Sequence, residues 1–542
     1  MQTAVVNAKI YVEEGRFASA LLIENGVIQR VGETAGILAE ADRNAQVIDA
    51  GGRLVLPGMN DSHQHLFNLG RRLSTLNLSG ARSIDEIVER GRKFIAEHPE
   101  ACSGLRAAGW NQDYFTDEKR LLNRFDLDRI STEIPLVFRR ICGHIGAANT
   151  AALNKAGITG QTPQPEGGRF GLLPDGTPDG IFNEHALDML DDVIPPETEE
   201  QRLNQVLQAL DYAVSVGLTS VQSNDAGQGD GGQIFRIMRR LCDEGRLPLR
   251  YRHQVSFSSP DAFREYLANE YDPEINDDRL AVGPLKLFKD GSLGARTALL
   301  RNDYCDDPGN HGVEALSDAE MDALCDLAQR HGVQVVTHVI GDGAVQKTLD
   351  TYEKVLAGRP NDLRHGLVHC QITDRAQLER IGRLGILTLA QPVFIHYDSH
   401  IVESRVGHDL AQTSYAFKTL AKLGSPVSFG TDSPVEDCNP FPCIAAAVNR
   451  QDPDGLPEGG YVPSERMSVA QAVDCYTAGS AYAEFCETRK GRLKPGFWAD
   501  LIVVDRDIFE IDSHLIGQTK VLLTMTDGEV VYQRPNGVEK KG

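Results

Sequence analysis

Eight short apolar runs alternate with helix-like segments along the middle of this 542-residue chain. The runs are LVLPG (54–58), LTSVQS (218–223), LRYRHQVSF (249–257), PLKLF (284–288), VQVVTH (333–338), GLVHC (366–370), ILTLAQ (386–391) and PVSFG (426–430). Segments between them, such as LNQVLQALDYAVSVG, DALCDLAQRHG and AQLERIGRLG, have helical periodicity and end in a glycine that suits a helix C-cap. Alternation of this kind predicts parallel βα units, and eight of them predict an α/β fold of the (β/α)8 TIM-like barrel type. Reactive residues are then expected at the carboxyl-terminal ends of the strands.

The two ends of the chain differ in pattern from its middle. Residues 1–53 and 489–542 contain short alternating strands and turn dipeptides such as NG and DG. Neither end has enough apolar surface for a core of its own, so we expect them to pair into one composite β-sandwich domain. The barrel is then expected over residues 54–488.

Residues 75–205 do not fit the alternating pattern. They contain aromatic, loop-like sequence and a stretch rich in glycine and proline. Because a structureless loop of this size is improbable in a compact protein, we expect an inserted subdomain after the first barrel strand. Its attachment beside the reactive end of the barrel favours a cover over the substrate, and a peripheral stabilising insert is the alternative.

Composition excludes several functional classes. The formal net charge of −22 repels phosphate backbones and anionic membranes, so neither nucleic acid nor a membrane is an expected partner. The ten cysteines show no CxxC pair and no disulfide framework, and no apolar stretch approaches the length of a membrane span. We expect a soluble cytoplasmic protein that acts on a small molecule, with a homodimer as the default assembly.

Polar residues that close the apolar runs are the candidate site. His63 and His65 are two residues apart, so on an extended segment both side chains leave the same face and can meet one ion. Lys286 lies among apolar neighbours, where an unpaired ammonium is expensive to desolvate, so it needs a partner or a chemical modification. Lys289 is expected on the opposite side of the strand, beside an Asp290-Gly291 turn and in solvent.

Three further candidates close later runs. His338 and His369 each end a strand-like run, and either one alone is more often a hydrogen-bonded structural histidine. Their corresponding positions on consecutive strands favour a shared site. Asp432 follows the eighth run and can reach a metal-bound water, with an Asx-turn as its structural alternative. Imidazoles, a carboxylate and a modified lysine can hold one or two divalent ions, which predicts a metal-dependent hydrolase.

Segments along nearly the whole chain carry a family resemblance: PGMNDSHQH, GLTSVQSND, KLFKDGSLGARTA, HVIGDGAV, RHGLVHCQI, FGTDSP and GRLKPGFWADLIVVD. In this set and order the chain resembles the amidohydrolase superfamily, in the amidohydrolase 3 branch that contains N-substituted formamide deformylases. The resemblance implies a metal-bearing barrel with a composite β-domain, with His63 and His65 on the more buried metal, and His338 and His369 on the other. It also implies that Lys286, carboxylated by carbon dioxide, bridges two ions, with Lys289 as the alternative, and that Asp432 binds metal and shuttles a proton.

The expected reaction is hydrolysis of a carbon–nitrogen bond in a non-peptide amide or N-formyl compound by a metal-activated water. Asp432 can act first as general base and then as general acid. These ligand types suit zinc, iron, manganese and other metals, and zinc is the metal that we expect. His144, Trp110 and Arg296 are candidate substrate contacts. Hydrolysis of a cyclic amide, a lactone or an aminated heterocycle is the main alternative, and an inactive hydrolase-like assembly protein is a remote one.

Overall fold

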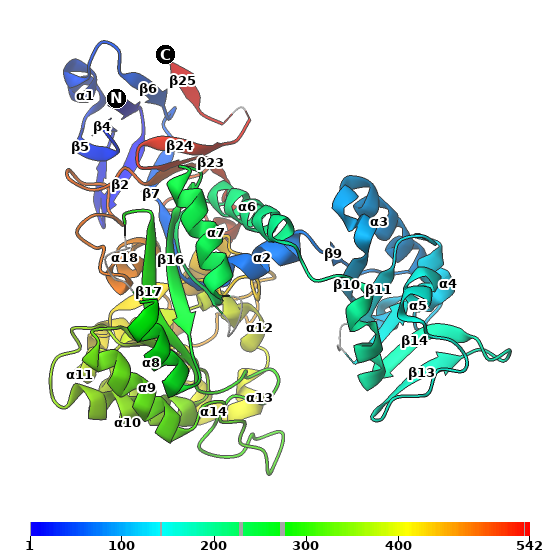
Figure 1. Ribbon diagram of the computed structural model, residues 1–542. Coiled ribbons are helices and arrows are strands. Elements are labelled where there is room, and N and C mark those ends of the chain that lie inside the picture. The colour runs from blue at the N-terminus through cyan, green and yellow to red at the C-terminus, as the bar shows by residue number, and fades with distance from the viewer. Residues whose placement is uncertain (1, 141–143, 227–230, 272–276, 536, 542) are drawn as a thin grey trace. The chain divides into compact units, whose positions relative to one another are not determined.

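The computed structural model describes residues 2–140, 144–226, 231–271, 277–535 and 537–541 (Figure 1). The chain forms two compact units. The first contains residues 1–68 and 209–542, and the second contains residues 69–208. Within the described part of the chain, no helix has the length and apolar character that a membrane crossing requires.

The first unit contains one sheet of eight parallel strands. In the order of their pairing they are β8 (Met59–Gln64), β15 (Leu218–Ala226), β16 (Arg250–Ser256), β17 (Leu280–Phe288), β18 (Val335–Val339), β19 (Gly366–His369), β20 (Leu387–Ala390) and β21 (Val427–Phe429). The first and last strands meet as well, because the backbone N–H of Asp432 donates to the carbonyl of His63 at 2.9 Å. The predicted (β/α)8 barrel is therefore confirmed.

Helices connect consecutive strands of the barrel. They are α7 (Gly231–Asp243), α8 (Pro260–Asn269), α9 (Asp318–Arg330), α10 (Asp342–Leu356), α11 (Arg375–Leu384) and α15 (Phe417–Leu423). The three segments predicted as helices correspond to α6 (Glu199–Ser215), α9 and α11. In α11, Asp374 and Gln377 form a capping box at the start, and Gly385 ends the helix in the left-handed conformation. Local sequence therefore sets where these helices begin and end.

Shorter helices complete the first unit. They are α1 (Thr34–Glu40), α2 (Leu66–Leu73, which runs into the second unit), α12 (Ile395–Asp398), α13 (Val402–Val406), α14 (His408–Ala411), α16 (Pro440–Asn449), α17 (Val469–Asp474) and α18 (Ser480–Ala483). The helices α12 to α14 lie in the chain between β20 and β21. They add side chains near the carboxyl-terminal ends of the strands.

The first barrel strand lies one strand later in the chain than the sequence predicts. The apolar run at 54–58 forms β7 (Leu54–Pro57), which pairs with β2 and β22 outside the barrel. The barrel strand is the next segment, β8, whose residues are mostly polar yet all buried. Hydrogen bonds replace apolar contacts there, as between Asp61 and Thr431, so β8 shows no apolar strand pattern.

Both ends of the chain form the β-structure beside the barrel (Figure 1). One sheet contains β24 (Glu529–Gln533), β23 (Val521–Thr526), β22 (Leu501–Val504), β7, β2 (Lys9–Glu13) and β3 (Arg16–Ala18). The other contains β25 (Glu539–Lys541), β6 (Gln46–Asp49), β1 (Gln2–Val6), β4 (Ala20–Glu24) and β5 (Val27–Gly32). A shared core that includes Val5, Leu21, Val55, Leu501 and Leu523 lies between them. The strands of the two termini therefore complete each other's hydrophobic core.

The second unit is built around a six-stranded sheet. Its strands are β13 (Gly168–Leu172), β14 (Pro178–Glu184), β12 (Ile145–Ala148), β11 (Leu136–Arg140), β10 (Leu105–Trp110) and β9 (Leu76–Asn77). Helices α3 (Ile84–Glu97), α4 (Arg124–Asp128) and α5 (Thr150–Ala156) belong to the same unit. Two apolar clusters, one with Phe138 and one with Phe182, give it a core of its own.

Candidate metal centre

The predicted ligands gather where the barrel strands end. His63 lies near the end of β8, Lys286 near the end of β17, and His338 near the end of β18. His369 is the last residue of β19, and Asp432 follows β21 by three residues. Because the carboxyl-terminal ends of parallel strands meet at one rim of a barrel, residues from distant parts of the sequence converge there.

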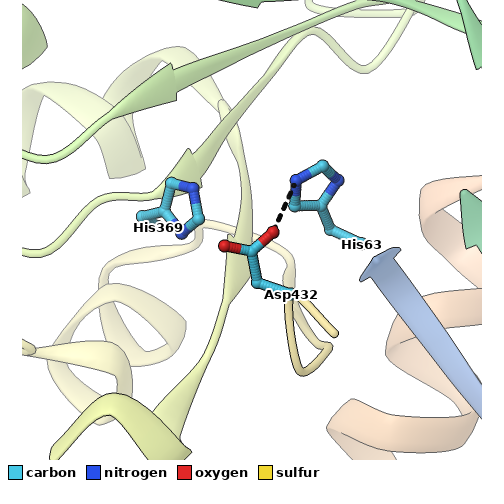
Figure 2. A group of neighbouring side chains, drawn as sticks. All are labelled: His63, His369 and Asp432. Atoms are coloured by element: carbon cyan, nitrogen blue, oxygen red, sulfur yellow. Dashed lines mark ion pairs between the residues drawn. The ribbon is translucent and has the colours of Figure 1, made fainter. Parts of the chain in front are cut away.

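Three of these side chains form a compact ligand group (Figure 2). The ligand atoms of His63, His369 and Asp432 all lie within 4.8 Å of one another. Oδ1 of Asp432 is 3.3 Å from Nε2 of His63 and also 3.3 Å from Nε2 of His65. The ring of His338 adjoins that of His369, with 4.5 Å between the ring centroids. Four imidazoles and one carboxylate therefore share one pocket.

Side-chain amides orient two of the imidazoles. Nδ1 of His63 lies 2.8 Å from Oε1 of Gln254, and Nδ1 of His369 lies 2.7 Å from Oε1 of Gln391. Each glutamine also donates its Nε2 hydrogen to a backbone carbonyl, which turns its oxygen toward the histidine. Nδ1 therefore carries the proton on both rings, and Nε2 keeps a lone pair directed at the shared pocket.

Backbone carbonyls orient the other two imidazoles. Nδ1 of His65 lies 2.6 Å from the carbonyl oxygen of Asn224, and Nε2 of His338 lies 3.0 Å from that of Gly291. A carbonyl can only accept, so these ring nitrogens carry the proton. The lone pair is then on Nε2 of His65 and on Nδ1 of His338.

Burial keeps two of these rings neutral. Burial, together with the positive charge of Lys286, lowers the pKa of His63 to about 4 and that of His338 to about 3. At neutral pH both imidazoles therefore offer a lone pair rather than a charge. A neutral imidazole is the form that binds a divalent ion.

Two of the candidate ligands have an unusual backbone conformation. His369 has φ of 73° and Asp432 has φ of 57°, both in the left-handed region that favours glycine. The backbone N–H groups of Asp432 and of Cys370, which follows His369, donate to carbonyls of β8 and β18 and so hold these bends. Backbone conformations of this kind concentrate at functional sites.

Lys286 is a buried cation without a hydrogen-bond partner among the described residues. Its side chain is wholly buried, and Nζ lies 3.8 Å from the centre of the Phe288 ring. Burial lowers its pKa to about 7. An orphaned amine beside the imidazoles of His63, His338 and His369 fits a site in which the lysine is converted into an anionic ligand for divalent metal. These side chains therefore fit the divalent metal that the sequence predicts.

Lys289 is buried, and its predicted exposure to solvent was wrong. Its Nζ donates to Oε1 of Glu314 at 2.5 Å, to Oδ1 of Asp318 at 2.6 Å and to the carbonyl of Leu316 at 2.7 Å. The side chain does leave the opposite face of β17 from Lys286, as the alternation of a strand requires. Two carboxylates outside the barrel, rather than water, balance its charge.

Two further carboxylates belong to the site, and the sequence predicts only a turn for one of them, Asp290. Asp61 lies inside β8 and accepts hydrogen bonds from the N–H of His63 and from the N–H and hydroxyl of Thr431. Asp290 accepts from the N–H groups of Leu299, Ile340 and Gly341. Burial raises the pKa of each carboxyl to about 7. Both hold the loops that carry the ligands.

The sequence reasoning also missed Gln254 and Gln391, which orient histidines. Each is an amide inside or at the end of an apolar strand run, and each is buried. Such a polar residue needs a partner, which is the signal that could have identified it.

The three predicted substrate contacts have structural partners. Trp110 is a core residue of the second unit: it is wholly buried and its indole N–H donates to the carbonyl of Phe138, which favours a structural role, and contact with substrate stays a prediction. His144 pairs with Glu184 at 2.9 Å, and Arg296 makes two hydrogen bonds to Asp306. For His144 and Arg296, contact with substrate stays a prediction.

Comparisons with known proteins identify the family to which the chain belongs. The model of the amidohydrolase family matches residues 46–532. The chain is 31% identical to YtcJ of Bacillus subtilis (strain 168) over 526 residues, which are 96% of this chain and 97% of that protein. It is 26% identical to N-substituted formamide deformylase of Arthrobacter pascens over 548 residues, 98% of each chain.

A solved structure has the same fold. The crystal structure of an uncharacterized metal-dependent hydrolase from Pyrococcus furiosus superposes with a TM-score of 0.76 at 30% identity, covering 94% of this chain and all of the other. The sequence match and the superposition both extend over most of the chain. This protein belongs to the amidohydrolase family and is a metal-dependent hydrolase.

Proposed function

We propose that this protein hydrolyses the carbon–nitrogen bond of a small non-peptide amide or N-formyl compound. The observation that carries the proposal is the clustering of four imidazoles with the Asp432 carboxylate, together with the buried, unpartnered amine of Lys286. The resemblance of the whole chain to N-substituted formamide deformylase supports the type of bond.

The ligand assignment is part of the proposal. His63 and His65 would hold the more buried of two ions, and His338 and His369 the other. Lys286, carboxylated by carbon dioxide, would bridge them, which removes the buried positive charge that its surroundings leave unbalanced. We propose zinc as the metal because it accepts this mixture of nitrogen and oxygen ligands. When bound, such ions lower the pKa of a water molecule to about 7 and polarise a carbonyl.

Asp432 is the proposed proton carrier. Its Oδ1 lies at the centre of the ligand group, 3.3 Å from two imidazole nitrogens, and it is nearly buried. From there the carboxylate can accept a proton from the attacking water and deliver it to the amide nitrogen as the carbon–nitrogen bond breaks. The products are a carboxylic acid, which is formate for an N-formyl substrate, and a free amine.

The test is identification of the products. Purified protein is incubated with a panel of N-formyl amines, N-acyl amines, lactams, lactones and aminated heterocycles, and formate, other acids, amines and ammonia are measured. Release of an acid and an amine in equal amounts from an open-chain amide supports the proposal. Ammonia release from heterocycles, or ring opening of lactones with no open-chain amide cleaved, would replace it with another reaction of the same centre.

A further inference from the structure

A cavity of about 220 Å³ adjoins the candidate metal centre. Three residues that line it, Ile340, Gln371 and Val435, lie two or three positions beyond a candidate ligand on β18, on β19 and after β21. The ring of Phe394, which also lines the cavity, stacks on the ring of His369 with 5.9 Å between centroids. The cavity therefore begins one side chain away from His369.

The walls of this cavity are largely apolar. Leu293 and Ile340 are buried in them, whereas Tyr397 and Val435 are 61% and 66% exposed and form an apolar rim. The cavity is smaller than the range of about 300–1,000 Å³ that holds drug-sized ligands. It therefore suits a short chain or a small ring rather than a peptide or a large ligand.

The charge of the cavity has one sign. Asp398 and Glu436 line it, and the described lining residues include no lysine, arginine or histidine. An anionic ligand would meet the carboxylate of Asp398. A neutral or cationic ligand is favoured.

Asp398 is a charged residue in the wall of the cavity. Its side chain is only 9% exposed, and Oδ2 accepts a hydrogen bond of 2.7 Å from the hydroxyl of Tyr415. Within the described part of the chain, no residue donates to Oδ1. Burial raises the pKa of Asp398 to about 6, and the Tyr415 hydroxyl opposes this rise, so the group is mostly ionised at neutral pH. Oδ1 is not fully buried, so it can accept a hydrogen bond from a ligand in the cavity.

We propose that this cavity binds the nitrogen-side substituent of the substrate and that Asp398 receives a protonated amine at its far end. The substrate class is then the monoacylated small diamine, in which an amide nitrogen and an ammonium are joined by a short apolar chain. The inference rests on the proposed function only in taking an amide as the reacting group. The apolar walls would contact the chain, and Asp398 would discriminate between its possible ends.

The test uses the N-methanesulfonyl derivatives of three amines of matched length, cadaverine (on one nitrogen only), hexylamine and ε-aminohexanoate, because the sulfonyl group removes the charge of the nearer nitrogen and resists hydrolysis. They end in an ammonium, a methyl and a carboxylate at the same distance from the sulfonylated nitrogen, which takes the place of the amide nitrogen. Binding to the purified protein is measured by calorimetry, which does not depend on turnover. The ammonium ligand is expected to bind at least about tenfold more tightly than the methyl ligand, as a charge-assisted hydrogen bond requires, and the carboxylate ligand more weakly than both.

A pair of variants then locates the preference. In Asp398→Asn, the affinities for the ammonium and methyl ligands are expected to differ by at most about threefold, which corresponds to roughly 0.7 kcal/mol. Glu403→Gln is the control, because Glu403 is an exposed carboxylate of α13 outside the cavity and the substitution makes the same change in charge. It is expected to keep the preference of the unaltered protein.

Equal binding of the three ligands to the unaltered protein would overturn the inference, and this comparison needs no variant to fold. A preference that survives in Asp398→Asn would also overturn it. Turnover of the three corresponding N-formyl compounds separates this inference from the proposed function. Cleavage without the ammonium preference contradicts the role of Asp398 alone, whereas tight ammonium binding without any amide cleavage contradicts the proposed reaction alone.

Discussion

At the scale of residues, two buried lysines, one near the end of β17 and one directly after it, show how surroundings separate chemical roles. Lys286 faces the imidazoles and has no hydrogen-bond partner among the described residues, whereas Lys289 donates to two carboxylates and a carbonyl. The sequence identified Lys286 by its apolar neighbours. It could not identify the environment of Lys289, because Glu314 and Asp318 lie 25 and 29 residues further along the chain.

Replacing each lysine with methionine should give opposite results. In metal-free protein, Lys286→Met should raise the free energy of unfolding by about 1–4 kcal/mol, because it removes an unbalanced buried charge. It should abolish turnover and remove one metal, and Lys286→Ala, which leaves space for an added ligand, should regain part of the turnover with short-chain carboxylates.

Lys289→Met is the matched control, directly after the same strand. It should lower the free energy of unfolding by about 1–3 kcal/mol, because charge-assisted hydrogen bonds are lost, and it should leave the metal content unchanged. Denaturant unfolding and elemental analysis measure both quantities. Loss of metal in Lys289→Met with full metal in Lys286→Met would transfer the bridging role to Lys289.

Asp432→Asn tests the proton carrier. The amide has nearly the same size as the carboxylate but cannot accept the proton of the attacking water, so kcat should fall by at least about a hundredfold. The fold, followed by circular dichroism, and most of the bound metal should remain. Turnover close to that of the unaltered protein at saturating substrate would remove Asp432 from the mechanism.

At the scale of elements, β8 explains most of what the sequence could not predict. Its segment MNDSHQ has no apolar alternation, so the preceding apolar run was taken as the first barrel strand. The strands β17 to β21 were found because most of their residues are apolar. In β8 the hydrogen bonds of Asp61 to Thr431 hold the first strand to the loop after β21, and a partner 370 residues away leaves no local signal.

Thr431→Val should weaken this connection between the ends of the barrel. The Thr431 hydroxyl donates to Asp61 at 2.5 Å, and its loss leaves the carboxylate short of one donor, which should lower the free energy of unfolding by about 1–3 kcal/mol. Metal affinity should fall as well, because the same loop carries Asp432.

Thr351→Val is the control for this substitution. Thr351 is buried, and its hydroxyl donates to Asp322 at 2.6 Å between the outer helices α9 and α10. A similar loss of stability with unchanged metal affinity is expected there. Equal metal affinity in both variants would show that the Asp61 connection does not position the ligands.

At the scale of the whole molecule, the repeating pattern made the fold predictable and distant contacts made the site only partly so. Strand and helix periodicity is local, and it identified seven of the eight barrel strands. The six predicted ligands end or follow such strands, so their convergence was expected from topology. Gln254, Gln391, Asp61 and Asp290 act through partners in other βα units, which no local pattern encodes.

The central claim is that the imidazoles at the barrel rim hold divalent metal. Elemental analysis of the purified protein should find one to two divalent ions per chain, and His63→Ala/His65→Ala should lose at least one of them. His185→Ala/His408→Ala, which replaces two exposed histidines, should keep the full content. Full metal occupancy in the His63 and His65 double variant would contradict the account.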